Sequence, residues 1–451
     1  MHHLQYKHYL LALLTVVAAF NYLDRAVLSL LLEPIKEDLE LSDSQLGFLT
    51  GFAFAVFYAV AGIPIARWAD RGNRNTVITA TTALWSAMVA LCGLVNSYTQ
   101  LLLVRVGVAV GEAGCVPPAQ SLIADYFDRV ERPRAMAVYW LCYPISMILG
   151  YLGGGWLAES VGWRMTFIVI GVPGVVLAIL VKLTLREPRL KQTKIFVVEQ
   201  PSFKVVLTTL WQQHSFRQIV TAFCLASFFG IGVVQWLPTF FIRSHGMEIG
   251  ELGFWFAFAW GLCGMFGTYL GGALATRYAA NKEALQMRVL AVLCVLSGSL
   301  YVMVYLLPNQ YVALAFMSII AALFAMFNGP VFSMIQSLVN DRMRSVALAL
   351  TFLFANLIGF GLGPVAVGVL SDLLAPKFGQ ESLRYALTLF SPGYLWLAYH
   401  YWQAGNTIEA DIRRVELELT DEEERLIIQV TEERVVNKRE SIGSDKYQSL
   451  D

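Results

Sequence analysis

Apolar residues along the chain gather in twelve blocks, and each block has about the length of a membrane-spanning helix. Roughly 20 consecutive apolar residues are needed to cross the hydrocarbon core of a bilayer as a helix. The blocks cover about 9–32, 46–66, 76–95, 99–124, 135–158, 164–185, 217–242, 249–276, 288–307, 311–338, 345–374 and 383–402. This pattern predicts an all-α membrane protein with twelve transmembrane helices.

The composition agrees with a membrane protein. The 451 residues are 57% hydrophobic and only 15% charged, whereas soluble domains have about 25% charged residues. The first apolar run continues past Asp24 to Leu32 without a convincing cleavage site. We therefore interpret it as an uncleaved first span rather than a signal peptide.

The basic residues of the predicted loops set the orientation. The loops on the side of the N-terminus hold most of the Lys and Arg residues that precede the tail. Because Lys and Arg accumulate in cytoplasmic loops, both termini are predicted to be cytoplasmic.

The chain also divides into two halves. The longest internal connection, 186–216, is basic and leaves six spans on each side. Arg132–Ala137 after span four resembles Arg342–Ala347 after span ten. Such paired six-helix halves are typical of transporters that bind substrate between the halves. We predict an N-terminal half at 1–185, a cytoplasmic linker at 186–216, a C-terminal half at 217–402 and a charged cytoplasmic tail at 403–451.

The start of this tail has a helical pattern. Ile408, Ile412 and Val415 recur at helical spacing, which predicts an amphipathic helix. This helix is interpreted either as a solvated appendage or as a regulatory element.

Four charged residues interrupt predicted spans one and four: Asp24, Arg25, Arg105 and Glu112. A charge at bilayer depth costs at least about 2.5–3.5 kcal/mol on insertion scales and usually faces a partner or a transport pathway. Asp24 and Arg105 are expected to share a depth, and Glu112 lies two turns from Arg105 on the same helix face, roughly 10 Å deeper. The alternative is that Asp24 and Arg105 form a structural pair without a transport role.

These residues suggest roles in coupling and binding. None of the six His residues lies at the predicted membrane midplane, so a proton carrier must be Glu112 or Asp24. Glu112 is favoured, because Arg25 and Arg105 are expected to keep Asp24 ionised. Arg105 is expected to attract an anionic group. The full set of expected substrate-binding residues is Arg105, Arg25, Asn328, Asn356 and Gln235.

The loop at 66–75 resembles the signature loop of the major facilitator superfamily. Asp70, Arg71 and Arg74 fit that motif, whereas Thr276 stands where the second half would carry the acid. The resemblance implies a conformational latch formed by Asp70, Arg71, Arg74 and Arg134. The alternative is that these charges only set the orientation of a solvated loop.

The first six spans also resemble the bacterial branch of the spinster family within that superfamily. The motifs are Asn21-Tyr-Leu-Asp24-Arg25, Gly62-Ile-Pro64, Arg105-x-Gly107-x-x-x-Gly111-Glu112-Ala113-Gly114, Asp125-Tyr-Phe127 and Gly162-Trp-Arg164-x-x-Phe167. The resemblance covers 9–402. Animal members export lysolipids or sphingosine phosphate, so it implies the major facilitator fold, an amphiphilic substrate and a place in the bacterial inner membrane.

We therefore expect a proton-coupled secondary active transporter for an amphiphilic or organic anion. The alternatives are an uptake symporter for a small carboxylate or sugar acid, a membrane receptor, or an enzyme acting on lipid head groups. The sequence has no GxxxxGK[ST] loop and no HExxH motif, so we expect no enzyme activity, no metal and no cofactor. The expected partners of this monomer are its substrate, protons and membrane lipids, and not nucleic acid.

Overall fold

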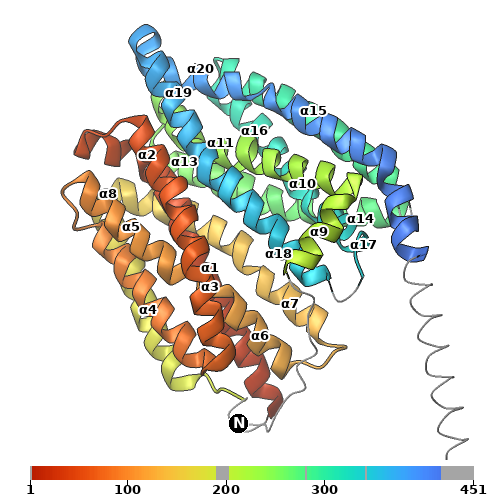
Figure 1. Cartoon of the computed structure of the whole chain (residues 1–451). Helices are drawn as coiled ribbons and strands as arrows, with labels where there is room; N and C mark the ends of the chain where they lie inside the picture. The colour runs from red at the N-terminus through yellow and green to blue at the C-terminus, as the bar shows by residue number, and fades with distance from the viewer. Residues whose placement is uncertain (1–2, 189–202, 280–281, 341–342, 418–451) are drawn as a thin grey trace, which may run out of the picture.

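The computed structural model describes residues 3–188, 203–279, 282–340 and 343–417, and this part of the chain is helical throughout, with short connections. The first helices form one bundle, which we call the N-terminal bundle (Figure 1). Its elements are α1 (His3–Leu39), α2 (Asp43–Thr50), α3 (Phe52–Arg71), α4 (Arg74–Cys92), α5 (Tyr98–Glu112), α6 (Val116–Tyr126), α7 (Arg132–Trp140) and α8 (Cys142–Thr184).

The remaining helices form the C-terminal bundle, in which three helices contain a π-helical turn. These turns are η2 (Ser227–Ile231), η3 (Ala257–Cys263) and η4 (Ala355–Gly361). The α-helices are α9 (Phe203–Gln212), α10 (His214–Ala226), α11 (Gly232–Val234), α12 (Leu237–His245), α13 (Ile249–Phe256), α14 (Gly264–Tyr278), α15 (Glu283–Leu306), α16 (Gln310–Met326), α17 (Asn328–Ser337), α18 (Arg344–Phe354), α19 (Leu362–Phe378) and α20 (Ser382–Phe390), with a 3-10 turn, η5 (Gly379–Glu381), before α20.

Ten helical segments in the described residues are long and apolar enough to cross a membrane. Two of them, Arg132–Thr184 with 53 residues and Val346–Leu417 with 72 residues, are long enough for two crossings. Each is interrupted by a glycine with positive φ, Gly162 (77°) or Gly379 (56°), a conformation that glycine adopts without a steric penalty. The chain therefore has ten to twelve membrane helices, and the predicted twelve correspond to two crossings in each interrupted segment.

The two bundles contact each other near α2, which packs against α19, while α8 packs against α13 (Figure 1). We call this side of the molecule the α2 side, and the side on which α1 begins the N-terminal side. Two glycines permit the close approach. A Cβ atom on Gly47 would lie 2.4 Å from the Pro364 carbonyl oxygen, and one on Gly253 would lie 2.4 Å from the Tyr151 carbonyl oxygen. Larger side chains at these positions would push the bundles apart.

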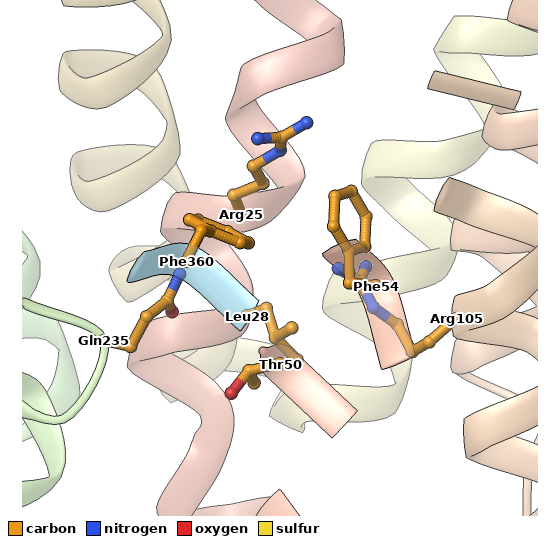
Figure 2. Close-up of a pocket in the computed structure, with 7 residues that line it drawn as sticks. All are labelled: Arg25, Leu28, Thr50, Phe54, Arg105, Gln235 and Phe360. Atoms are coloured by element: carbon orange, nitrogen blue, oxygen red, sulfur yellow. The ribbon is translucent and has the colours of Figure 1, made fainter. Parts of the chain in front are cut away.

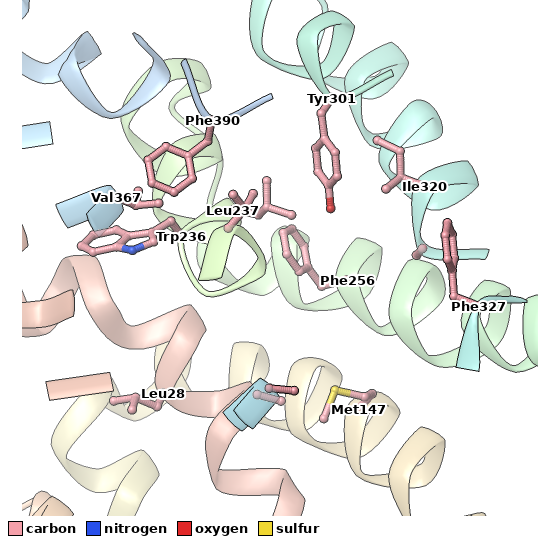
Figure 3. Close-up of a cluster of buried hydrophobic side chains, with 14 of the residues drawn as sticks. Leu28, Met147, Trp236, Leu237, Phe256, Tyr301, Ile320, Phe327, Val367 and Phe390 are labelled. Carbon is pink, nitrogen blue, oxygen red and sulfur yellow. The ribbon is translucent and has the colours of Figure 1, made fainter. Parts of the chain in front are cut away.

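One apolar cluster continues from one bundle into the other. Leu28 and Met147 of the N-terminal bundle belong to the same buried cluster as Trp236 and Phe256 of the C-terminal bundle (Figure 3). Trp236 also donates a hydrogen bond from Nε1 to the Pro364 carbonyl oxygen over 3.1 Å. The interface is therefore apolar at this depth.

The start of the tail is helical, as the spacing predicts, and it packs on the C-terminal bundle. The helix after α20 extends to residue 417, and Ile408 is fully buried. Asp411 accepts a hydrogen bond from the Ser215 backbone N–H over 2.9 Å, which satisfies one of the free N–H groups at the start of α10. This segment is therefore not a solvated appendage. Residues 418–451 of the tail and 189–202 of the linker lie outside the described residues.

Candidate functional site

The charged residues of α1 and α5 form two ion pairs. Arg105 Nη1 lies 2.7 Å from Asp24 Oδ2, and the side chains are 2% and 0% exposed respectively. The helix rise places both residues at a common depth, as the sequence predicts. Arg105 is therefore committed to Asp24 and is shielded from a ligand in this conformation.

The second pair joins Arg25 to Glu112, which the sequence reasoning did not predict. Arg25 Nε donates to Glu112 Oε2 over 3.0 Å. We had expected Arg25 to favour the ionised form of its neighbour Asp24. Instead its long side chain reaches Glu112, because adjacent helical residues point about 100° apart. Glu112 therefore has its own cation, and each of the two helices supplies one acid and one base.

Both carboxylates keep one oxygen free. Asp24 Oδ1 and Glu112 Oε1 are buried and have no hydrogen-bond partner among the described residues. An ionised carboxylate only accepts hydrogen bonds, whereas its protonated form also donates one. Each carboxyl group therefore has an oxygen available for a proton or a bridging water.

Arg25 is the most accessible of the four charged residues. Its side chain is 21% exposed, whereas that of Glu112 is 0% exposed. Its Cζ atom lies 4.7 Å from the ring centroid of Phe54 and 5.6 Å from that of Phe360. The rings of Tyr22 and Tyr58 are also within 5.6 Å. Cation–π contacts favour a guanidinium in such an aromatic environment, so the geometry makes Arg25, rather than Arg105, the cation that an anion reaches first.

The two arginines line a crevice between the bundles. Figure 2 shows Gln235 and Phe360 of the C-terminal bundle facing Arg25, with Phe54 and Arg105 across from them. Leu28 and Thr50 complete the lining, and the crevice is too tight to hold a water molecule in this conformation.

The three amides predicted to bind substrate have different positions. Gln235 lines the crevice, and its Oε1 atom has no hydrogen-bond partner among the described residues. Asn356 lies in η4 with an exposed side chain. Asn328 begins α17, but its side chain lies outside what the structure describes. Of the two amides whose side chains the structure describes, Gln235 is the one beside the charged site.

Among the described residues, the four predicted latch residues show no ion pair with the C-terminal bundle. Asp70, Arg71 and Arg134 are exposed. Arg74 is 1% exposed and forms ion pairs with Glu187 and with Asp125, the latter over 2.6 Å. Because both partners belong to the N-terminal part of the chain, Arg74 stabilises that bundle internally. Its assignment to an inter-bundle latch stays a prediction for the opposite conformation.

A cluster of ion pairs joins the two bundles on the α2 side, and the sequence reasoning missed it. We call this cluster, formed by Arg243, Glu33, Asp43 and Lys36, the gate. Arg243 of α12 forms ion pairs over 2.7 Å with both Glu33 and Asp43 of the N-terminal bundle. Asp43 also pairs with Lys36 over 2.6 Å. Arg243 is 6% exposed and Asp43 is 2% exposed, so solvent screens these contacts less than it screens surface pairs.

Asp372 of α19 adds a second connection to this gate. It accepts hydrogen bonds from the backbone N–H groups of Asp43 over 3.1 Å and Ser44 over 2.8 Å, and the Ser44 hydroxyl also donates to it. A carboxylate at the start of a helix satisfies free N–H groups and is favoured by the helix dipole. Asp372 therefore joins the C-terminal bundle to the first turn of α2.

Arg243→Gln is expected to shift the conformational equilibrium toward opening on the α2 side, because Glu33 then loses its cation. Labelling of a Thr50→Cys variant by a charged methanethiosulfonate reagent from that side measures the opening. Thr50 lies two helical turns from Asp43 along α2. With Arg243→Gln, the cysteine introduced there should react several-fold faster than it does with Arg243 present. Arg384→Gln is the matched control, because Arg384 contacts Glu381 and Ser244 within its own bundle. Equal reactivity in both variants would exclude Arg243 as the gate.

The signals for this gate were present in the sequence. Arg243 is one of few basic residues in the loops predicted to lie opposite the N-terminus, and such a residue near Glu33 is a candidate for an ion pair. Asp372 lies near the end of the predicted span 345–374. Neither residue was distinguishable from an orientation signal without the packing of the bundles.

A family model described as Major Facilitator Superfamily matches residues 14–364 of the chain. An "MFS-type efflux pump" of Mycolicibacterium smegmatis is 35% identical over 400 residues, which cover 88% of this chain and 92% of the relative. A probable galactarate/D-glucarate transporter of Bacillus subtilis is 26% identical over 302 residues, which cover 60% of this chain and 64% of the relative.

A solved structure of a bacterial homolog to the human lysosomal transporter spinster, in an inward-facing and unoccupied conformation, has a similar fold. Its TM-score is 0.81 at 28% sequence identity, and the match covers 90% of this chain and 98% of that chain. The spinster resemblance seen in the sequence motifs is thereby confirmed at the level of the fold.

Proposed function

The chain belongs to the Major Facilitator Superfamily, a family of transporters rather than enzymes, and on this premise we propose that it is a proton-coupled secondary transporter for an amphiphilic or organic anion. It is a multi-pass integral membrane protein with a spinster-like fold. The observation that carries the proposal is the accessible Arg25, paired with a fully buried Glu112 beside the interface of the bundles.

The proposal includes an orientation. The basic loops on the N-terminal side make that side cytoplasmic under the positive-inside rule, and the membrane is the bacterial inner membrane. The contacts of Arg243 and Asp372 then close the outer side of the protein. Asp70 is free to meet the C-terminal bundle only in the opposite conformation, which is open to the outside. The division into halves at 186–216 gives the two bodies that move in alternating access.

Coupling follows from competition for Arg25. An anionic head group that binds Arg25 displaces the Glu112 carboxylate from its cation. A buried carboxylate without a partner is costly, and binding a proton relieves that cost. The anion and the proton are therefore expected to bind together and to cross in the same direction. Asp24 stays paired with Arg105 and keeps that cation in place.

The lining of the crevice favours a substrate with one charged head group. Among the described residues, the neutral polar side chains of the lining are Thr50 and Gln235, beside the apolar Leu28, Phe54 and Phe360. A sugar acid has several hydroxyl groups, and each buried hydroxyl needs a hydrogen-bond partner. The C-terminal bundle also contains clusters of aromatic rings, including Phe228 stacked on Phe390 at 5.7 Å. These features support a lysolipid-like or sphingoid-like anion over the sugar-acid alternative, which the Bacillus relative represents.

Anionic lysolipids are expected to stabilise the purified protein against heat, whereas glucarate is not. A ligand at 100 times its Kd contributes about 2.7 kcal/mol of stability. The thermal-shift screen compares lysophosphatidic acid, glucarate and sphingosine, a lipid without an anionic group, on the wild type, on Arg25→Gln and on the control Arg384→Gln. The shift from lysophosphatidic acid should disappear in Arg25→Gln alone. Stabilisation by glucarate without lysophosphatidic acid would replace this proposal with the sugar-acid symporter.

A further inference from the structure

The ring of Phe54 contacts both ion pairs of the charged site. Phe54 lies on α3 and is 3% exposed. Its ring centroid is 4.7 Å from Cζ of Arg25 and 5.5 Å from Cζ of Arg105. Figure 2 shows it between these two side chains. Each guanidinium is hydrogen-bonded to a different carboxylate, so one aromatic ring contacts the cations of both pairs.

Phe54 also contacts the C-terminal bundle. Its ring centroid lies 6.0 Å from that of Phe360, at an interplanar angle of 57°. Phe360 belongs to the π-helical turn η4, and π-helical turns occur frequently at functional sites. Next to it, a Cβ atom on Gly361 would lie 3.3 Å from the Ala55 side chain. Any rotation of one bundle against the other must therefore change the surroundings of Phe54.

We propose that Phe54 is a positioning residue that couples the two ion pairs to each other and to the movement of the bundles. The inference rests on the proposed function and extends it. When an anion displaces Glu112 from Arg25, the ring continues to attract the guanidinium and keeps it at the interface. Because the same ring attracts Arg105, a shift of one guanidinium alters the environment of the other. Phe360 transmits that change to the C-terminal bundle.

The physical basis is the charge distribution of the aromatic ring. The face of a phenyl ring attracts a cation, and this attraction is strongest where water is excluded. The charged and titratable groups around the two guanidinium groups are Asp24 and Tyr22 of α1, Glu112 of α5, Tyr58 of α3, Tyr143 of α8 and Cys92 of α4. Phe54 is the ring that contacts both guanidinium groups among the described residues.

A test without substrate uses thermal unfolding. The shifts in Tm caused by Asp24→Asn and Glu112→Gln are measured singly and together, first with Phe54 present and then in the Phe54→Leu background. Groups that share a partner give non-additive effects. With Phe54 present the two shifts should be non-additive, and this coupling should fall clearly in the Phe54→Leu background. Equal coupling in both backgrounds would overturn the inference, whatever the protein transports.

A transport test uses proteoliposomes and a lysophosphatidic acid with a fluorescent acyl chain. The measured quantity is accumulation driven by a pH gradient divided by exchange without a gradient. Phe54→Leu, which keeps the apolar bulk, should lower this ratio about tenfold, equivalent to about 1.4 kcal/mol. Phe54→Tyr should preserve it, because the ring remains. Phe52→Leu, two residues away on the same helix, is the matched control and should match the wild type.

The outcomes separate the two claims. A Phe54→Leu variant with the wild-type ratio overturns the coupling role of Phe54. A Phe54→Tyr variant that fails as badly as Phe54→Leu overturns it too, since packing rather than the aromatic ring then matters. If the wild type shows exchange but no accumulation driven by the gradient, the proposed proton coupling is wrong, and the unfolding measurements still decide whether Phe54 connects the two pairs.

Discussion

Arg105→Ala is expected to abolish transport and to destabilise the protein. Asp24 is 0% exposed on its side chain and has Arg105 as its ion-pair partner. Removing one member of a buried pair leaves an uncompensated charge, which costs about 3–5 kcal/mol. Thermal unfolding and uptake by proteoliposomes measure the two effects.

A double variant separates structure from transport at this pair. Asp24→Asn combined with Arg105→Gln removes both charges and should recover most of the lost stability, because no buried charge is left alone. Transport should stay low if the charges take part in the cycle. Wild-type transport by this double variant would show that Asp24 and Arg105 form only a structural pair.

Glu112→Gln is expected to uncouple transport from the proton gradient. The amide keeps the shape and hydrogen-bonding capacity of the carboxyl group but cannot exchange a proton. Arg25 then binds an anion without displacing an acid, so substrate exchange should persist, while accumulation driven by a pH gradient should fall to the equilibrium level. Proteoliposomes with and without an imposed gradient measure the difference.

Asp24→Asn is the comparison for this experiment. If accumulation survives in Glu112→Gln and disappears in Asp24→Asn, the roles assigned to the two acids are reversed. If it survives in both variants, protons do not couple through these residues.

Hydropathy predicted the helices well but not their ends. The first span was predicted at 9–32, whereas α1 extends from His3 to Leu39. Its last turns include Glu33 and Lys36. Their charges lower the local hydropathy, so the predicted span ended before them. They remain in the helix because Arg243 and Asp43 from other helices neutralise them. Contacts between distant segments thus determine where this helix ends, and local composition alone does not predict that position.

The sequence identified the charged residues of the candidate site, but it identified only one of their two ion pairs. Depth along a helix was sufficient to place Asp24 beside Arg105, because these two residues lie at a common depth on neighbouring helices. It failed for Arg25 and Glu112, because a guanidinium reaches residues at another depth. For Arg74, the sequence reasoning did not find the ion pairs that it forms within the N-terminal bundle. Its partner Glu187 lies in the stretch predicted as a linker, where no pattern indicated a contact.

The most direct test of the central claim is the movement of protons with the substrate. Proteoliposomes that contain a pH-sensitive dye receive fluorescent lysophosphatidic acid on the outside, with no imposed gradient. If the anion and the proton bind together through Arg25 and Glu112, the lumen of wild-type vesicles should acidify as the lysolipid enters, and Glu112→Gln vesicles should take up lysolipid without acidification. Entry of the lysolipid into wild-type vesicles with no change in lumenal pH, or with alkalinisation, would contradict the account.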